Sequence, residues 1–206
     1  MKKQILYAGA LAACLGLASA ELAAAQAVTK DPAAVKSGTY KVEDHHTQVG
    51  FSLSHLGITD YAGFFHNATG SATIDAANPA ASKLNVTVPI ASVMTTVPSL
   101  GEQLKTKNWF DAETYPTATF VSTKITLTGK GTAVVDGDLT LHGVTRPVSL
   151  NAHLVGSGVN VLNKVYSIGF SATTTIKRSD FGIKTAVPMV GDDVTLNISL
   201  ALEAQS

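Results

Sequence analysis

Histidine, arginine and aspartate side chains are the groups with which this chain could bind or transform a ligand. His55 has the same strand parity as Phe51 and Leu53, so the pattern predicts that it points inward near one end of the fold. Because a neutral imidazole both donates and accepts hydrogen bonds, His55 could bind a carbonyl or a phosphate group of a ligand there. The alternative is a structural hydrogen bond that closes the end of the fold.

A second polar group lies further along the chain, where Arg178 and Asp180 flank Ser179. A guanidinium can bind a pyrophosphate through two parallel hydrogen bonds, which makes Arg178 a candidate ligand-binding residue. The alternative is an ion pair between Arg178 and Asp180 that fixes the end of a strand. The sequence favours the ion pair and leaves both interpretations open.

Metal binding and catalysis have less support in the sequence. His45 and His46 are adjacent, so on a strand their side chains would face opposite sides. His142 and His153 fall on the polar faces of different predicted strands. The sequence also has no Gly-x-Ser-x-Gly motif, no dinucleotide-binding glycine motif and no phosphate-binding loop. We therefore predict no metal site and no catalytic residue, and we expect a binding protein rather than an enzyme.

The start of the chain, residues 1–27, has the layout of a secretory signal peptide. A basic start precedes an uncharged apolar run from Ile5 to Leu17, and small residues offer cleavage sites at 18–20 and 25–27. The run is shorter than the roughly 20 apolar residues that a membrane span needs. We therefore expect this segment to be removed and the protein to be periplasmic.

The same segment has a competing interpretation as a lipoprotein signal. Leu11-Ala12-Ala13-Cys14 resembles the motif whose cysteine is acylated. Residues 15–18 stay apolar, however, where a lipoprotein usually turns polar. The cleaved signal peptide is therefore favoured over a lipoprotein anchored through Cys14.

The charge of the chain excludes one class of partner. Cleavage after Ala27 would remove Lys2, Lys3 and Glu21, so that the 15 basic and 15 acidic residues become 13 and 14, a net charge of −1. A nucleic-acid-binding protein should carry a basic surface, and we therefore expect no nucleic-acid partner. Cys14, the single cysteine, would leave as well, so the mature chain would have no disulfide.

From residue 39 onward, after a linker predicted over residues 28–38, apolar and polar side chains alternate. Alternation gives each strand one apolar and one polar face, which is typical of antiparallel sheets. About eight strands are expected, and their apolar faces are Val49, Phe51 and Leu53; Ala72 and Ile74; Leu84, Val86 and Val88; Ala118 and Phe120; Leu139 and Leu141; Val148, Leu150, Ala152 and Leu154; Ile168, Phe170, Ala172 and Ile176; and Val194, Leu196, Ile198, Leu200 and Leu202. A barrel and a sandwich both satisfy this pattern.

One segment departs from the strand pattern. Leu100 and Leu104 lie one helical turn apart, and Ser99 followed by Glu102 matches a capping box. Pro116 ends the segment. We therefore expect a short helix, capped by Ser99, across one end of the β structure.

Five blocks of the chain, in order, resemble the YceI-like family. The first, from Asp44 to Gly70, contains an Asp, a His two residues later, a Phe, and then His-Leu-Gly and Gly-x-Phe. The others are WFDAETYPTATFVST at 109–123, VDGDLTLHGVTRPV at 135–148, IKRSDFGI at 176–183, and the closing strand at 190–200. Together they extend over roughly residues 38–204, nearly the whole chain after the predicted signal peptide.

The resemblance implies an all-β fold over residues 39–206: an eight-stranded, elongated, antiparallel lipocalin-like barrel with a short helix near one end. It also implies export and, as in some members, binding of a polyisoprenoid or another long amphiphilic lipid inside the barrel. Barrels of about eight strands are either filled by side chains or hold one small ligand. The alternation pattern alone therefore leaves a solid core as the alternative.

The implied partner is an isoprenoid lipid of the quinone or polyprenyl phosphate type, with no further cofactor required. The residues expected to contact it are Phe51, Leu53, Phe120, Leu139, Leu141, Phe170, Ile198 and Leu200 on the inward faces, with His55 and Arg178 at a mouth. One alternative is an accessory module of a membrane b-type cytochrome that handles quinone. Another is an enzyme that acts on the lipid with His55 as acid or base. An exposed strand edge could also pair two copies into a homodimer.

Overall fold

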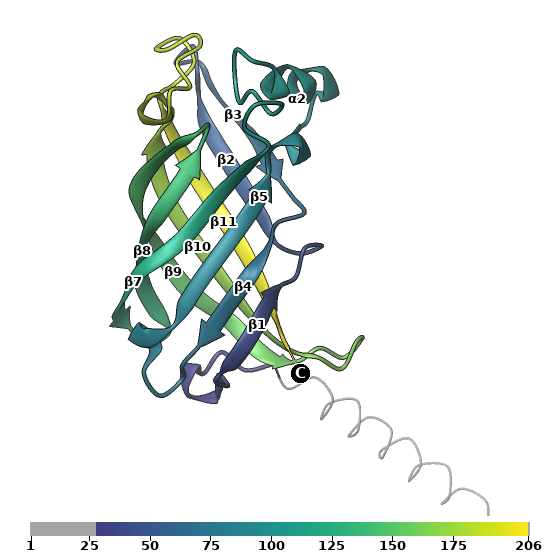
Figure 1. The fold of residues 1–206 in the computed structure, drawn as a ribbon, viewed down its shortest axis with the longest axis vertical. Coiled ribbons are helices and arrows are strands. Elements are labelled where there is room, and N and C mark those ends of the chain that lie inside the picture. The colour runs from purple at the N-terminus through teal and green to yellow at the C-terminus, as the bar shows by residue number, and fades with distance from the viewer. Residues whose placement is uncertain (1–27, 206) are drawn as a thin grey trace, which may run out of the picture.

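The alternating segments form a single antiparallel sheet of eleven strands in the computed structural model, which describes residues 28–205. Figure 1 shows the strands winding around one long axis. The strands are β1 (Gly38–Val42), β2 (Gln48–His55), β3 (Thr59–Phe65), β4 (Thr69–Ile74), β5 (Lys83–Pro89), β6 (Met94–Thr95), β7 (Thr117–Gly129), β8 (Thr132–Leu141), β9 (Val144–Val159), β10 (Tyr166–Lys177) and β11 (Asp193–Ala204). One α-helix, α2 (Pro98–Lys105), and four 3-10 turns, η1 (Pro32–Ala34), η2 (Pro79–Ala81), η3 (Ile90–Ser92) and η4 (Arg178–Phe181), complete the described elements.

The eleven strands act as eight continuous strands, which we call staves. β1 and β2 both pair with β11, and their other neighbours are β4 and β3, so β1–β2 and β3–β4 are two staves that are each interrupted once. β5 and β6 form a third interrupted stave. Because the first stave pairs with β11, the last, the sheet closes into a barrel in which neighbours in sequence are neighbours in space. The predicted eight-stranded antiparallel barrel is confirmed.

Buried hydroxyl groups replace the backbone hydrogen bonds that are missing where staves are interrupted. Between β1 and β2, Thr47 Oγ1 accepts from the Ala201 N–H at 3.0 Å and donates to the Ala201 carbonyl at 3.3 Å. Beside the break between β3 and β4, Ser92 Oγ accepts from the His66 N–H at 3.1 Å and donates to the Pro89 carbonyl at 2.6 Å. A buried amide without a partner costs about as much as a lost hydrogen bond. These hydroxyls therefore let the staves bend without leaving the backbone unpaired.

The short helix predicted near one end is confirmed as α2, at the upper end of the barrel in Figure 1. Its N-cap is Val97, which makes no side-chain cap bond, and Pro98 takes the first helical position. Proline is favoured there because the N–H that it lacks would be unpaired anyway. Ser99 therefore lies inside the helix, and the predicted capping box is wrong. Leu104 packs against the core at this end of the barrel.

The signal peptide predicted for residues 1–27, with Cys14, lies outside the residues that the structure describes. Within residues 28–205, no helix combines the length and the apolar character needed to cross a membrane. The segment predicted as a linker, residues 28–38, contains η1 and the first residue of β1. Thr29 also forms an isolated bridge with Ser157 of β9, so this segment is packed against the barrel.

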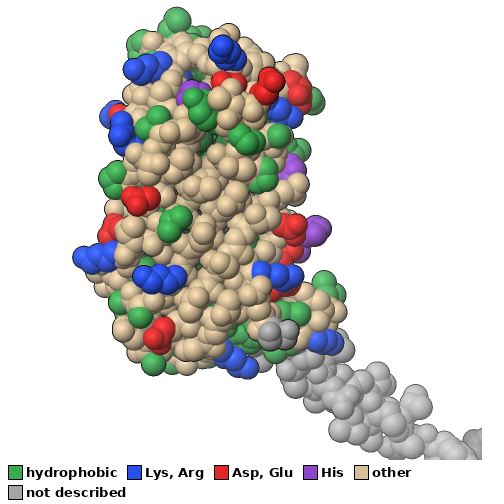
Figure 2. All heavy atoms as spheres, in the orientation of Figure 1, with side chains coloured by type: hydrophobic (Ala, Val, Ile, Leu, Met, Phe, Trp, Pro, Cys, Tyr) green, Lys and Arg blue, Asp and Glu red, His purple; other side chains and the backbone are tan. Residues whose placement is uncertain are grey.

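Buried apolar side chains gather in two clusters, one toward each end of the barrel. The upper cluster contains Phe51, Phe65, Ile90, Val93, Ile176, Phe181 and Val194. The lower cluster contains Tyr40, Val42, Ala68, Ala72, Ile168 and Leu202. On the outside, the face shown in Figure 2 carries scattered hydrophobic side chains separated by polar surface. The barrel therefore buries apolar side chains mainly toward its two ends, while others stay exposed on its surface.

The Thr47 bridge should contribute measurably to stability. Thr47→Val keeps the shape of the side chain but leaves the Ala201 N–H unpaired inside the wall, so we expect a loss of about 1–3 kcal/mol of unfolding free energy. Thr47→Ser, which retains the hydroxyl, is the matched control and should lose less. Urea denaturation of the three proteins measures the difference, and equal midpoints for Thr47→Val and wild type would contradict the role of the bridge.

Candidate ligand cavity

An apolar cavity of about 600 Å³ extends along the inside of the barrel. This volume lies within the roughly 300–1,000 Å³ that is usual for pockets that hold a small molecule. Every stave contributes to the wall, for example through Val49, Ile74, Val86, Phe120, Leu139, Leu150, Phe170 and Leu200. The side chains in the wall are overwhelmingly aliphatic or aromatic, so the cavity suits an apolar chain rather than a polar molecule.

The inward side chains in the middle of the staves do not fill the interior. On β10, Ile168 and Ile176 near the two ends are 1% and 9% exposed, whereas Phe170 and Ala172 between them are only partly buried. All four face inward on one strand, and Phe170 and Ala172 line the cavity. Their exposed area therefore faces the cavity, and the solid-core alternative is wrong.

Nine of the ten residues predicted to bind the ligand lie on the cavity wall. They are Phe51, Leu53, Phe120, Leu139, Leu141, Phe170, Arg178, Ile198 and Leu200. Strand parity located the apolar ones because a closed barrel turns one face of each stave inward. That these side chains contact a lipid stays a prediction.

His55 is the exception, and its predicted inward position is wrong. His55 ends β2, is exposed, and does not line the cavity. Its backbone pairs with Thr59 in the β2–β3 hairpin and forms an isolated bridge with Val190. Alternation along a strand says which side chains share a face, but that face points into a cavity only where the rest of the barrel surrounds it. The end of this hairpin lies beyond the cavity.

Two glycines that the sequence analysis did not single out shape the wall. A Cβ at Gly63 would lie 2.4 Å from Phe51 Cζ, and a Cβ at Gly137 would lie 2.4 Å from Phe120 Cζ. Each glycine therefore lets a phenylalanine ring lie flat against the wall instead of projecting toward the axis. The sequence signal for these two glycines is their place in a strand at a position where apolar, inward-facing residues are expected. A glycine there often marks the close approach of another group.

A hydrogen-bond network around Arg178 closes the upper end of the cavity. The side chain is 5% exposed, and it donates from Nε to the Gly191 carbonyl at 2.9 Å, from Nη1 to Ile183 at 3.0 Å and from Nη2 to Val190 at 2.7 Å. Its guanidinium lies 5.7 Å from the ring centroid of Trp109. Three carbonyls of one loop are thus held by one cation, which fixes that loop over the end of the barrel.

Asp192, not Asp180, is the carboxylate of this network, so the predicted pair of Arg178 with Asp180 is wrong. The turn η4 carries Asp180 to the surface, whereas Asp192 accepts from the Ser179 N–H at 2.9 Å and from the Ser179 hydroxyl at 2.7 Å. The hydroxyl bond, together with the amide and with the charges of Lys177 and Arg178, outweighs partial burial and lowers the pKa of Asp192. Burial lowers the pKa of Arg178, and the charge of Asp192 opposes that effect.

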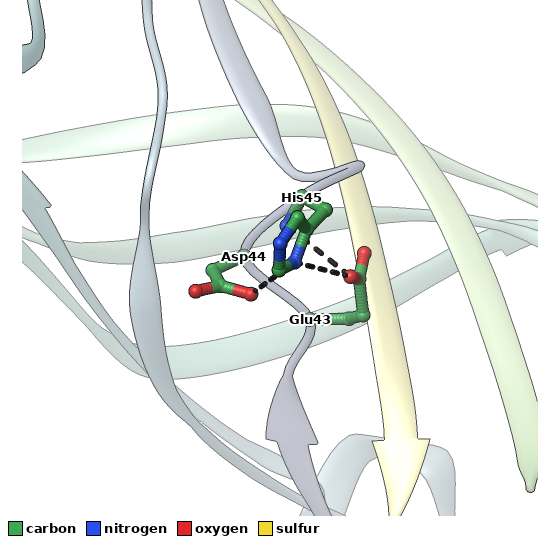
Figure 3. Close-up of side chains that lie close together, drawn as sticks. All are labelled: Glu43, Asp44 and His45. Atoms are coloured by element: carbon green, nitrogen blue, oxygen red, sulfur yellow. Dashed lines mark hydrogen bonds and ion pairs between the residues drawn. The ribbon is translucent and has the colours of Figure 1, made fainter.

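Another polar cluster lies on the turn between β1 and β2 (Figure 3). The Glu43 carboxylate accepts from the backbone N–H of His45 at 3.2 Å and of His46 at 2.8 Å, and it also lies 2.8 Å from His46 Nδ1. The Nδ1 of His45 lies 2.8 Å from Asp44 Oδ1. Both histidines therefore sit on a turn and not on a strand, so the alternation of strand side chains does not decide their orientation.

Glu43, Asp44 and His45 bring atoms that could hold a metal ion within 4.8 Å of one another. Both oxygens of Glu43, however, already accept the amide hydrogens that shape the turn. The cluster is therefore explained as a support for the interruption between β1 and β2. The predicted absence of a metal site stays a prediction.

The lower end of the cavity reaches the molecular surface. Leu127 lines the cavity near the end of β7 and is nevertheless 55% exposed. The exposed residues Lys83 and Lys130 also border the cavity there. At the upper end, by contrast, the lining residues Ile90 and Ile183 are 1% and 3% exposed. Exposed side chains therefore border the cavity at its lower end, whereas the loop that Arg178 holds covers its upper end.

A closed eight-stave antiparallel barrel around an apolar cavity places this protein among the small barrels that can hold one hydrophobic ligand. The chain belongs to the YceI-like family, whose domain model matches residues 40–202. A UPF0312 protein of Pseudomonas savastanoi pv. phaseolicola is 39% identical over 93% of this chain and 94% of its own length.

Solved structures agree with this assignment. The crystal structure of Campylobacter jejuni YceI protein is 31% identical and superposes with a TM-score of 0.65 over 75% of this chain and 91% of that chain. A polyisoprenoid-binding domain from Saccharophagus degradans, implicated in plant cell wall breakdown, has a TM-score of 0.60 at 17% identity over 82% of this chain and all of that chain. At that identity the second likeness shows the fold alone.

The closed upper end should weaken in acid because the pKa of Asp192 is lowered in the folded state. Its contribution to stability is complete above the unfolded carboxyl pKa of about 3.9 and is lost as the pH falls below that value, through the folded pKa. Asp192→Asn cannot titrate, so the stability gap between wild type and this variant should shrink as the pH falls from 6 to 2. Urea denaturation at each pH measures the gap, and a constant gap would contradict the assignment.

Proposed function

We propose that this protein is a binding protein that takes the tail of one long-chain isoprenoid lipid, of the quinone or polyprenyl phosphate type, into the barrel. The observation that carries the proposal is the apolar cavity of about 600 Å³ lined by all eight staves. Burial of each methylene group contributes about 0.8 kcal/mol, so two further buried methylenes should tighten binding roughly tenfold. Affinity should therefore depend on tail length more than on the head group.

The likeness to the polyisoprenoid-binding domain of Saccharophagus degradans supports the choice of ligand. The signal-peptide layout of residues 1–27 supports a periplasmic location, where a carrier can hold a water-insoluble lipid between membranes. The barrel interior provides what such a role needs, because it separates an apolar tail from water without requiring a chemical step.

The enzymatic alternative depended on a residue that does not face the cavity. It assigned acid–base chemistry on the lipid to His55, which is exposed and lies off the cavity wall. Arg178, the buried cation on the wall, already donates three hydrogen bonds to backbone carbonyls. A carrier that returns its ligand unchanged is therefore the function that the geometry supports best.

Native mass spectrometry of the protein purified gently from its own periplasm, followed by organic extraction, tests the proposal. The expected result is one adduct per chain that resolves to an isoprenoid lipid. A mass that shows no adduct, and that stays unchanged after incubation with isoprenoid quinones and polyprenyl phosphates, would overturn the proposed function. Recovery of a chemically altered lipid would favour the enzymatic alternative.

Filling the cavity should abolish binding without disturbing the outside of the barrel. Ala172 faces the cavity in the middle of β10, and Thr173 beside it is exposed on the outer face. We expect Ala172→Phe to weaken isoprenoid binding at least tenfold, because the added ring occupies the path of the tail. Thr173→Phe adds the same group on the other face and should bind as wild type does. Titration by tryptophan fluorescence measures both, and equal affinities would place the ligand elsewhere.

A further inference from the structure

The wall of the cavity includes a segment that is not part of the sheet. Residues 28–37, which we call the N-terminal arm, cross the lower end of the barrel in Figure 1, and Asp31, Pro32, Ala33 and Val35 line the cavity there. The arm meets the β7–β8 hairpin, since a Cβ at Gly131 would lie 3.2 Å from Pro32 Cγ. It therefore lies across the end at which the cavity reaches the surface.

The backbone contacts that hold the arm are few. Thr29 and Ser157 exchange two hydrogen bonds, from the Thr29 N–H to the Ser157 carbonyl at 2.9 Å and from the Ser157 N–H to the Thr29 carbonyl at 2.8 Å. The Ala34 carbonyl accepts from the Tyr166 hydroxyl at 2.9 Å. The Lys36 carbonyl accepts from the Tyr40 hydroxyl at 2.7 Å, and Ser37 Oγ accepts from the Ala76 N–H at 2.8 Å. The arm is thus held at Thr29, at the last residue of η1 and where it joins β1.

The charged side-chain contacts of the arm lie in solvent. Asp31 Oδ1 is 3.5 Å from Lys130 Nζ, and these side chains are 51% and 80% exposed. Lys36 Nζ lies 4.7 Å from the ring centroid of Tyr166. Exposed ion pairs contribute little because water and salt compete for both partners. Every residue of the arm is exposed or only partly buried, and Val35 packs against the edge of the lower cluster.

The residue that anchors the arm has a polar group without a partner. Ser157, which pairs with Thr29, is 2% exposed, and its Oγ makes no hydrogen bond within the described residues. A buried hydroxyl without a partner costs free energy, so the anchor at Ser157 is not reinforced by its side chain. The upper end of the barrel is built differently, because Arg178 holds its loop there through three hydrogen bonds from a buried cation. The two ends thus differ in how firmly they are closed.

We propose that the N-terminal arm is a gate: it lifts from the lower mouth to admit or release the lipid tail and closes over the mouth when the tail is inside. The identity of the ligand that passes the gate, a lipid tail, rests on the proposed function. The upper end stays closed throughout, so exchange passes through the lower mouth alone. Movement of the arm, rather than opening of the barrel wall, sets the rates of uptake and release.

A disulfide that locks the arm tests this inference. Thr29 and Ser157 form a hydrogen-bonded antiparallel pair, whose Cα atoms lie about 5.5 Å apart, a spacing that a disulfide accepts. The lock is Thr29→Cys with Ser157→Cys in the full chain carrying Cys14→Ser. The matched control is Thr175→Cys with Thr195→Cys, a pair that joins β10 to β11 on the outer face, away from the arm. A third variant deletes residues 28–35.

The probe is N-phenyl-1-naphthylamine, an apolar dye that is not an isoprenoid. Stopped-flow fluorescence measures the rates of its uptake and release. We expect the oxidised lock to slow dye uptake and release at least tenfold, reductant to restore the wild-type rates, and the control disulfide to change neither rate. The deletion should raise both rates several-fold.

Equal rates for the oxidised and reduced lock would overturn the gate, and so would wild-type rates in the deletion variant or a complete absence of dye uptake. The dye separates this inference from the choice of ligand. If the lock slows the dye but no isoprenoid binds in the mass-spectrometric experiment, the gate stands and the proposed ligand is wrong. If isoprenoids bind and the lock has no effect, the gate alone is wrong.

Discussion

The barrel must bury an apolar inner face that its own side chains do not fill. Apolar groups around an empty space lose the dispersion contacts that close packing would supply. The middle of the barrel therefore contributes less to stability than an equal area of solid core. The shape must be maintained by the closed ladder of backbone hydrogen bonds, by the clusters toward the two ends and by hydroxyls such as those of Thr47 and Ser92 that repair the ladder at its breaks.

Several blocks that carry the family resemblance meet at the closed end of the barrel. His142, from the block at 135–148, packs against Tyr115 in a tilted arrangement with a centroid distance of 4.5 Å. Its Nδ1 donates to the carbonyl of Phe181, from the block at 176–183, at 3.2 Å. The turn at His142 has a positive φ of 52°, continued by Gly143 at 73°, as a tight two-residue hairpin requires. Much of the family signature is thus explained by the construction of this end, and the cavity wall needs only apolar residues of suitable size.

Strand parity predicted the wall because a period of two is fixed by backbone geometry, and Phe120 or Leu200 could be assigned from their immediate neighbours. His55 failed because parity does not say where a strand passes the end of the barrel. Arg178 was recognised as important, but its partners are carbonyls of a loop that approaches only in the folded chain. Contacts between residues far apart in the sequence also determine how the phenylalanine rings pack at Gly63 and Gly137. The same holds for the packing of the N-terminal arm.

The pairing of the first stave with the last has a consequence for how the chain reaches this fold. Most strand pairings join neighbours in sequence and can form while the chain is being synthesised, but β1 and β2 must wait for β11. A chain that lacks its last dozen residues keeps an open edge and an exposed apolar trough. Closure of the barrel is therefore a late step that requires the residues of β11. Only a chain that includes β11 can therefore close the barrel, and a product truncated before β11 cannot reach the folded state.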